Sequence, residues 1–332
     1  MTMKTDWQEI FKGFNSKNIL VIGDVMIDSY VVGNVNRISP EAPVPVVSVS
    51  KRYNRLGGAA NVALNLKSLG ANAILCSAIG NDSKGKDFMD LLEKRSLSKE
   101  GILMSEDRIT TTKFRVIGNK TQMLRVDEED TNKLSSKDFV LLSGKINHLL
   151  NTLPISAVIF EDYDKGIIDS RLVDFVIKKA SEKNIIITAD PKKDNFSLYS
   201  NLTIFKPNLK ELNEGEGLNI KSGDIEAITK ASRELIRQKN HRSVLVTLSE
   251  YGMLSVEAGE AYHAPAEIRN IADVSGAGDT VISTVTLALC AGLDMKRSVG
   301  LANLAGGLVC ETVGVVPIER NRLLNEVINS EL

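Results

Sequence analysis

The sequence predicts an α/β fold in which a mostly parallel β-sheet lies between two layers of helices, with a second, small β-sheet outside it. First, short apolar runs alternate with amphipathic helical segments from residue 155 onward, as in parallel sheets whose strands are joined by helices. Second, polar residues directly follow several of these runs, at the sheet edge where α/β proteins bind ligands. Third, β-rich pieces interrupt the alternation earlier in the chain. We therefore expect a single domain over residues 1–332 with lid strands near 30–50 and 111–127.

The composition indicates a globular protein with small ligands. Of 332 residues, 43% are hydrophobic, which is enough for a sizeable core. The 41 basic and 42 acidic residues give a formal net charge of -1, which argues against a broad basic surface for nucleic acid or anionic lipid. The three cysteines lack Cys-x-x-Cys spacing and the three histidines are scattered, which argues against disulfides or a metal cluster. The N-terminal segment lacks the apolar core of a signal peptide and no run is long enough to span a membrane, so we expect a cytoplasmic protein.

Two carboxylates follow the first predicted strand. A short helix is expected within residues 1–17, and the apolar run 18–22 then leads to Asp24, with Asp28 four residues later. Such carboxylates either bind ligand hydroxyls or cap the next loop through Asx turns, and the sequence leaves both interpretations open.

Four β-rich pieces predict the small sheet. They are residues 30–32, 44–49, 112–117 and 122–127, and the last two flank a turn that contains Gly and Asn. Such a sheet can cover a site or pair with another subunit, because its edges are otherwise unprotected.

A di-glycine, Gly57-Gly58, leads into a predicted helix over residues 59–69. Asn61, in the first turn, can bind a ligand hydroxyl or serve only in packing. The remaining expected strands are 72–79, 155–160, 184–189, 202–205, 243–248, 252–256 and 261–263. The remaining expected helices are 86–97, 170–181, 225–238, one with Asp279 in its first turn that runs to 290 or 291, 297–312 and 319–328.

The stretch from Asp273 to Thr280 stands directly before an apolar helix. Gly276 and Gly278 allow successive backbone N–H groups to turn toward one point, where the positive end of the helix dipole adds to them, so that this point binds an anion. Asp279 lies in the first helical turn, where it can take a proton from a hydroxyl that attacks a phosphate. The same residues are also compatible with an ordinary tight turn and a helix-start carboxylate.

This stretch resembles the C-terminal signature of the ribokinase-like (PfkB) sugar kinases, D-[TV]-[TS]-G-A-G-D, at every position. The run from Gly57 to Asn61 is similar to their N-terminal signature, and the resemblance extends from Ile19 to Pro317. It implies a ribokinase-like three-layer α/β/α sandwich with a small β-sheet lid. It also implies transfer of a phosphoryl group from ATP to a sugar with Mg2+, and leaves dependence on a monovalent cation open.

The resemblance also implies roles for single residues. Asp279 is the catalytic base, and Gly276, Ala277 and Gly278 form the anion hole. Asn208 and Glu211 match the N-x-x-E motif that acts on magnesium through water. The matching nucleotide-side residues are Asn208, Thr247, Ser249, Gly252, Asn303 and Gly314, and the acceptor-side residues are Asp24, Asp28, Gly57, Gly58 and Asn61.

A narrower resemblance is to the kinases of ADP-heptose synthesis. It rests on Gly23–Asp28, Arg37–Val46, Asp162–Gly166 and Asp190–Lys192, of which Arg37–Val46 is the most specific. It implies phosphorylation of O1 of D-glycero-β-D-manno-heptose 7-phosphate, a step toward ADP-heptose and the lipopolysaccharide core. The chain departs from this pattern at three positions, Asp164, Lys193 and Ser275, and ends without the cytidylyltransferase-like domain of bifunctional versions, so we expect the free-standing type.

A phosphorylated acceptor requires a cationic pocket. The candidates are Arg37, Arg115, Arg125, Lys165 and Lys192. The rival interpretations are a related kinase of fructose, ribose or 2-keto-3-deoxygluconate, and a non-catalytic sugar-binding regulator on the same fold; an intact base and anion hole argue against the regulator. We expect a homodimer that forms through the lid strands, and neither nucleic acid nor membrane as a partner.

Overall fold

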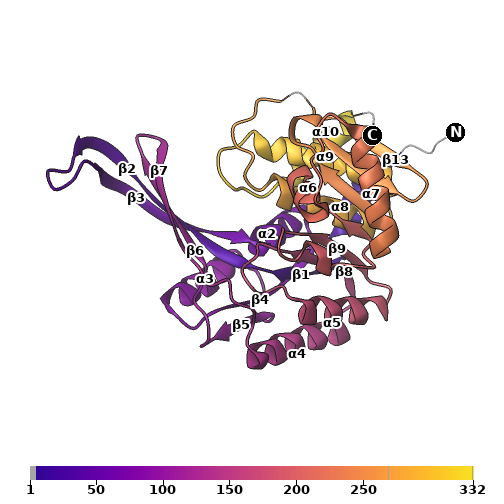
Figure 1. The fold of residues 1–332 in the computed structure, drawn as a ribbon, viewed down its shortest axis with the longest axis horizontal. Helices are drawn as coiled ribbons and strands as arrows, with labels where there is room; N and C mark the ends of the chain where they lie inside the picture. Colours follow the sequence, from indigo (N-terminus) through magenta and orange to yellow (C-terminus); the bar gives the residue numbers. More distant parts are fainter. Residues whose placement is uncertain (1–4, 268, 331) are drawn as a thin grey trace.

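A nine-stranded sheet forms the centre of the molecule in the computed structural model, which describes residues 5–267, 269–330 and 332 (Figure 1). The strand order is β13-β12-β11-β10-β9-β8-β1-β4-β5, and neighbours are parallel except for the antiparallel pairs β11–β12 and β12–β13. The strands are β1 (Asn18–Gly23), β4 (Asn72–Gly80), β5 (Ile102–Ser105), β8 (Ile155–Glu161), β9 (Ile186–Asp190), β10 (Ile204–Phe205), β11 (Ser243–Thr247), β12 (Met253–Glu257) and β13 (Ala261–Ala264).

Helices cover both faces of this sheet, which confirms the predicted three-layer α/β/α sandwich. One face carries α1 (Trp7–Phe14), α2 (Ala59–Leu69), α3 (Ser83–Lys94), α8 (Ala277–Cys290), α9 (Met295–Cys310) and α10 (Arg320–Asn329). The other carries α4 (Ser136–Thr152), α5 (Ser170–Ser181), α6 (Leu209–Glu216) and α7 (Ile225–Lys239).

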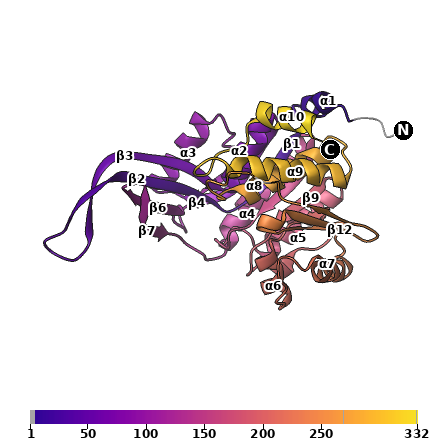
Figure 2. The same ribbon diagram turned by 90° about the horizontal axis from the view of Figure 1, so that it is seen from above.

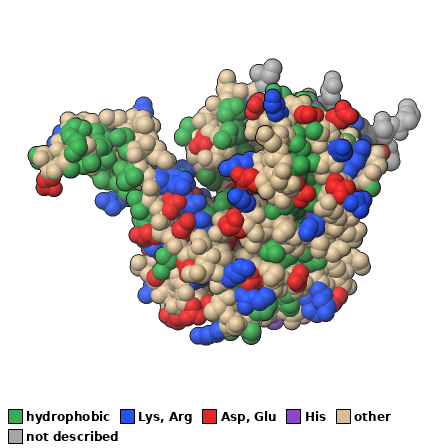
Figure 3. Space-filling model, viewed as in Figure 1, with side chains coloured by type: hydrophobic (Ala, Val, Ile, Leu, Met, Phe, Trp, Pro, Cys, Tyr) green, Lys and Arg blue, Asp and Glu red, His purple; other side chains and the backbone are tan. Residues whose placement is uncertain are grey.

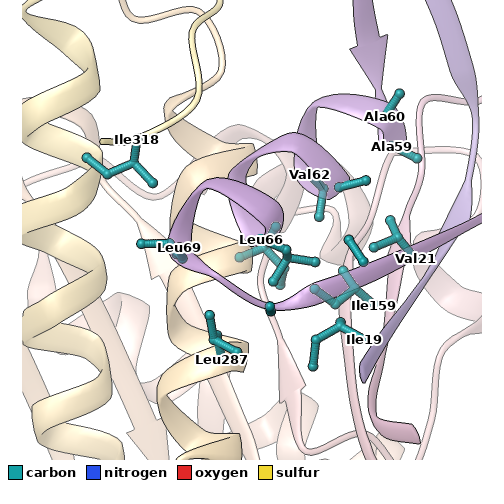
Figure 4. Close-up of a cluster of buried hydrophobic side chains, with 14 of the residues drawn as sticks. Ile19, Val21, Ala59, Ala60, Val62, Leu66, Leu69, Ile159, Leu287 and Ile318 are labelled. Carbon is teal, nitrogen blue, oxygen red and sulfur yellow. The ribbon is translucent and has the colours of Figure 1, made fainter. Parts of the chain in front are cut away.

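The core forms because side chains of a strand point alternately to the two faces. In β1, Ile19 and Val21 pack under α2, whereas Leu20 and Ile22 pack on the opposite face. Figure 4 shows Val62 and Leu66 of α2 packed over the side chains of β1. This packing fixes α2 and α8 side by side over the sheet, so their first turns lie close together.

A separate four-stranded sheet extends from the body. Its order is β3-β2-β6-β7, with β2 (Val25–Ile38), β3 (Pro45–Gly58), β6 (Thr112–Gly118) and β7 (Thr121–Glu128). The β2–β3 hairpin runs far out from the body, as both views show (Figures 1 and 2). The inner end of β2 is buried and its outer end is exposed. We call this four-stranded sheet the lid.

The structure differs from the prediction mainly in the lid and in three elements of the body, one of which, α4, is a helix of 17 residues. Strands β2 and β3 are both 14 residues long, much longer than the predicted 30–32 and 44–49. Their outer halves are exposed and therefore carry no strict alternation of apolar and polar residues. Helices α4 and α6 and strand β5 were not predicted at all. Within the described ranges, no helix is long and apolar enough to cross a membrane.

Candidate active site

The N-terminus of α8 forms the centre of the site. Gly276 precedes the helix with φ 82°, a left-handed conformation that glycine adopts without strain. The N–H groups of Gly278 and Asp279 donate to no protein group among the described residues, as expected in a first helical turn. These amides and the helix dipole can bind an anion directly above Gly278.

Asp279 is held by two side chains from distant parts of the chain. Its Oδ2 accepts a 2.6 Å hydrogen bond from Asn61 Nδ2 of α2, and its Oδ1 accepts a 3.0 Å hydrogen bond from the Tyr163 hydroxyl. Burial raises the pKa of Asp279, although the hydrogen bond from Asn61 lowers it in part. A buried carboxylate with a raised pKa, fixed beside an anion site, is suited to accept a proton.

Three strand ends place charged side chains directly under this helix. Glu161, Asp190 and Lys206 end or follow β8, β9 and β10, all on the face that α8 covers. A Cβ atom added at Gly278 would lie 3.6 Å from both Asp190 Oδ2 and Lys206 Nζ. Lys206 pairs with Asp190 at 2.7 Å while almost fully buried. The site floor therefore carries fixed charges within reach of an anion at Gly278.

The pKa values of Glu161 and Asp190, the two carboxylates under α8, are shifted in opposite directions. Burial, reinforced by the charges of Asp190 and Asp279, raises the pKa of Glu161 well above its usual range. Neither carboxylate oxygen of Glu161 has a hydrogen-bond partner among the described residues. Burial would also raise the pKa of Asp190, but the ammonium groups of Lys192 and Lys206 outweigh it and lower that pKa. Glu161 is thus the more readily protonated of these two carboxylates, and Asp190 the more readily ionised one.

Asp24 caps a loop. Its Oδ2 accepts the N–H groups of Tyr163 and Lys165, and its Oδ1 accepts that of Ile167. Both oxygens are therefore used by the segment after β8, and the side chain is 1% exposed. Of the two interpretations open at this position, the geometry favours loop capping over direct contact with a ligand. The loop in turn positions the Tyr163 hydroxyl on Asp279.

Asp28 lies at the root of the lid, where it pairs with Arg115 of β6. Its carboxylate is also next to Gly57, because a Cβ atom at Gly57 would lie 2.7 Å from Asp28 Oδ2. Gly58 is equally constrained, with φ 61° and a Cβ position 2.3 Å from the Asp24 carbonyl oxygen. The di-glycine thus allows β3 to pass close to both carboxylates before α2 begins.

Four of the five basic residues predicted for an acceptor phosphate are already paired with carboxylates, Arg115 among them through Asp28. Lys165 pairs with Glu129, and Lys192 pairs with Asp190 and Glu211 near Asp279. Arg125 pairs with Asp127 on exposed strand β7. Arg37 does not join the site of its own chain, because it follows Asp28 by nine residues of extended strand, or about 30 Å.

The predicted nucleotide-side residues cluster in part. A pocket of about 650 Å³ is lined by Asn208, Thr247 and Ser249 together with the first turns of α6. Gly252 closes the turn after Ser249 with φ 81°, and a Cβ atom there would meet the Ala264 carbonyl oxygen. Two further candidates are not among the lining residues: Asn303 donates to the Pro265 carbonyl, and the Gly314 N–H donates to Asp273.

A scan against family models matches residues 16–321 to the pfkB family carbohydrate kinases. The chain belongs to this family. It is 38% identical over 300 residues to the bifunctional protein HldE of Helicobacter pylori (strain J99), which covers 90% of the chain and 64% of that protein. It is likewise 38% identical over 309 residues to the bifunctional protein HldE of Methylobacillus flagellatus, which covers 93% of the chain and 63% of that protein. The chain thus spans less than two thirds of the length of these relatives.

Solved structures show the same fold. Phosphofructokinase-2 from Escherichia coli in complex with potassium aligns with a TM-score of 0.75 and 18% identity, over 94% of this chain and 98% of that one. Ribokinase from Thermotoga maritima aligns with a TM-score of 0.66 and 18% identity, over 95% and 99% of the two chains. The chain is accordingly a phosphotransferase that acts on a sugar hydroxyl, as its family membership shows.

The family implies magnesium, and the residues present fit that ion. Asn208 and Glu211 form a reciprocal capping box at the start of α6, in which Glu211 Oε2 accepts the Asn208 N–H. Glu211 Oε1 and Asp190 Oδ1 both contact the Lys192 ammonium, at 2.6 and 3.3 Å. These two carboxylates therefore already stabilise one positive charge at the place where a magnesium ion would bind. No described group of three or more His, Cys, Asp or Glu side chains is arranged to hold a metal. Few oxygen ligands and retained water are typical of magnesium.

Sequence reasoning did not single out Tyr163, Asp190 or Lys206 as site residues. Tyr163 and Asp190 stand inside two of the quoted runs, and Lys206 directly follows a predicted strand. Their position at or after the ends of strands was the feature of the sequence that could have indicated a site. The sequence does not show on which face of the sheet each of these side chains lies.

Proposed function

We propose that the chain transfers the γ-phosphoryl group of ATP to O1 of D-glycero-β-D-manno-heptose 7-phosphate. The observation that supports kinase chemistry is the fixed carboxylate of Asp279 beside the open amides of α8. The choice of acceptor is supported by the Arg37–Val46 run, by the likeness to the HldE proteins and by basic side chains at the root of the lid. Because ATP is a cytoplasmic substrate, the proposed reaction takes place in the cytoplasm.

In this mechanism Asp279 accepts the proton of the attacking anomeric hydroxyl. Asn61 and Tyr163 orient its carboxylate, and burial keeps Tyr163 protonated because it raises the pKa of that phenol well above 10. The first-turn amides of α8 stabilise the negative charge that develops on the transferred group. Asp190 fixes the Lys206 ammonium below this point. A bound magnesium ion, near Glu211, would neutralise charge on the phosphates of ATP.

The lid has two roles in the proposal: it closes over the acceptor, and it forms the contact between subunits. Closure over the acceptor would exclude water and suppress hydrolysis of ATP. The lid also exposes apolar side chains, among them Ile38 (60% exposed), Val44 and Leu124 (57%), and Figure 3 shows hydrophobic side chains over the protruding part. We propose that a second copy of the chain covers them in a homodimer.

The acceptor is tested by a coupled assay of ATP turnover against a panel of sugars. The panel contains heptose 7-phosphate, fructose 6-phosphate, fructose, ribose and 2-keto-3-deoxygluconate. The proposal requires the highest kcat/KM for heptose 7-phosphate. A higher value for a neutral sugar would leave only the family assignment standing.

A further inference from the structure

The inner face of the lid carries a row of charged side chains at its root. In both antiparallel and parallel pairs, residues in direct register point to the same face. The register across the four strands gives one row of Arg55, Asp28, Lys113 and Asp127, and a second row, two residues further out, of Tyr53, Tyr30, Arg115 and Arg125. Figure 3 shows basic side chains gathered where the lid meets the body.

This face points toward the catalytic carboxylate. Lys113 Nζ lies 5.9 Å from the centre of the Tyr163 ring, and the hydroxyl of that ring bonds Asp279. On the other side, Arg55 donates to the Val315 carbonyl, and Val315 lies beside Gly276. A sugar hydroxyl at Asp279 therefore places the rest of the acceptor against the root of the lid.

Most cations around this space are already neutralised. Arg115 pairs with Asp28, Arg125 with Asp127, and Lys165 with Glu129. Lys113 differs, because it makes neither an ion pair nor a side-chain hydrogen bond with any residue in the described ranges. It is half-buried, and burial together with the charge of Lys165 lowers the pKa of its ammonium.

Asp28 and Asp127 lie beside Lys113 and their charges favour its ammonium, but each is paired with an arginine, Arg115 or Arg125, and not with Lys113. The half-buried ammonium thus loses hydration without gaining an ion pair of its own. An anionic ligand would supply the missing partner, and its charge would stabilise the ammonium form. A phosphate dianion fits this position better than a carboxylate, because its additional oxygens can also accept hydrogen bonds from the N–H donors that Arg115 and Lys165, beside Lys113, do not use on their own carboxylate partners.

We propose that Lys113 binds the phosphate that the sugar acceptor already carries. This inference rests on the proposed function and adds the residue that selects a phosphorylated acceptor over a neutral one. Lys113 is a substrate-binding residue that acts at the far end of the acceptor from Asp279. Its loss therefore affects acceptor binding and leaves the chemistry at O1 intact.

The test compares Lys113→Met with Lys51→Met, which removes an exposed lysine further out on the same sheet. For each variant, kcat and KM are measured with heptose 7-phosphate, with the same heptose lacking phosphate, and with ATP. We expect Lys113→Met to raise KM for heptose 7-phosphate by about 10- to 100-fold, as for a lost charge-assisted hydrogen bond. The KM for ATP, and kcat/KM for the unphosphorylated heptose, should stay within about threefold. Lys51→Met should match wild type throughout.

Equal losses with both heptoses, or no change with either, would overturn the assignment of Lys113 while the proposed function stands. If wild type itself prefers a neutral sugar or the sugar acid 2-keto-3-deoxygluconate, the proposed function fails and the phosphate assignment with it. If Lys113→Met does not fold, the assignment is tested instead on the wild-type protein, by measuring how fast a chemical reagent acetylates Lys113. Heptose 7-phosphate, but not the unphosphorylated heptose, must slow that acetylation as followed by mass spectrometry; equal rates refute the assignment.

Discussion

The hydroxyl of Tyr163 donates a 3.0 Å hydrogen bond to Oδ1 of Asp279, across 116 residues of sequence. The bond stabilises the ionised carboxylate and so offsets part of the rise that burial imposes on the pKa of Asp279. Tyr163 thereby connects the loop after β8, which Asp24 holds, to the first turn of α8.

Tyr163→Phe tests this connection. Without the hydroxyl, the pKa of Asp279 rises further, so the base becomes ionised only at higher pH. We expect the acidic limb of the pH profile of kcat/KM to move upward, with kcat near the optimum reduced about tenfold. The profile is measured beside Tyr262→Phe, a partly exposed tyrosine on β13. A limb that stays in place would show that Tyr163 does not act on the base.

Gly23→Ala should destabilise the fold strongly. A Cβ atom at Gly23 would lie 1.8 Å from the backbone oxygen of Glu161, and two paired central strands cannot move apart to relieve that contact. We expect a loss of about 3 kcal/mol or more in the free energy of unfolding, measured by urea denaturation. Gly13→Ala, which has nothing within 4 Å, is the control and should change stability by about 1 kcal/mol at most. Similar effects at both positions would contradict the packing between β1 and β8.

His241 should make stability depend on pH below neutrality. Burial lowers its pKa from 6.5 to about 4, and its Nδ1 accepts the Leu202 N–H. Because the unfolded chain binds the proton more readily, this contribution is fully present above about pH 6.5 and is lost as pH falls toward 4. The shift corresponds to about 3 kcal/mol. We expect His241→Asn to flatten the pH dependence of the free energy of unfolding between pH 7 and 4; an unchanged slope would disprove the neutral imidazole.

Much of the fold and the centre of the site were predictable from local sequence. The start of α8 is encoded by adjacent glycines and an apolar run, and α5 was predicted with its observed bounds, 170–181. The roles of Asp24 and Tyr163 were not predictable, because they depend on contacts across more than 100 residues. The length of β2 escaped prediction because its outer half faces solvent and lacks an apolar period. Helix α6 was hidden by its mostly polar sequence, although its Asn208–Glu211 capping box was visible.

The proposed dimer predicts that a charge on the lid separates the subunits. Leu124→Glu places a carboxylate on an exposed apolar position of β7, so we expect a monomer in sedimentation velocity at micromolar concentration. Val140→Glu alters an equally exposed apolar side chain on α4 and should leave a dimer. Wild type that sediments as a monomer, or a dimer that survives Leu124→Glu, would count against the lid as the interface.

The central claim is that Asp279 is the base of a phosphoryl transfer, and Asp279→Asn tests it most directly. The amide nearly preserves the shape of the side chain and removes the proton acceptor. The measurement pairs steady-state turnover of heptose 7-phosphate with calorimetric binding of ATP, for wild type, Asp279→Asn and the partly exposed control Asp87→Asn on α3. The account predicts that kcat falls by about a thousandfold or more for Asp279→Asn while ATP affinity stays within about threefold, and that the control matches wild type. Turnover by Asp279→Asn within about tenfold of wild type would contradict it.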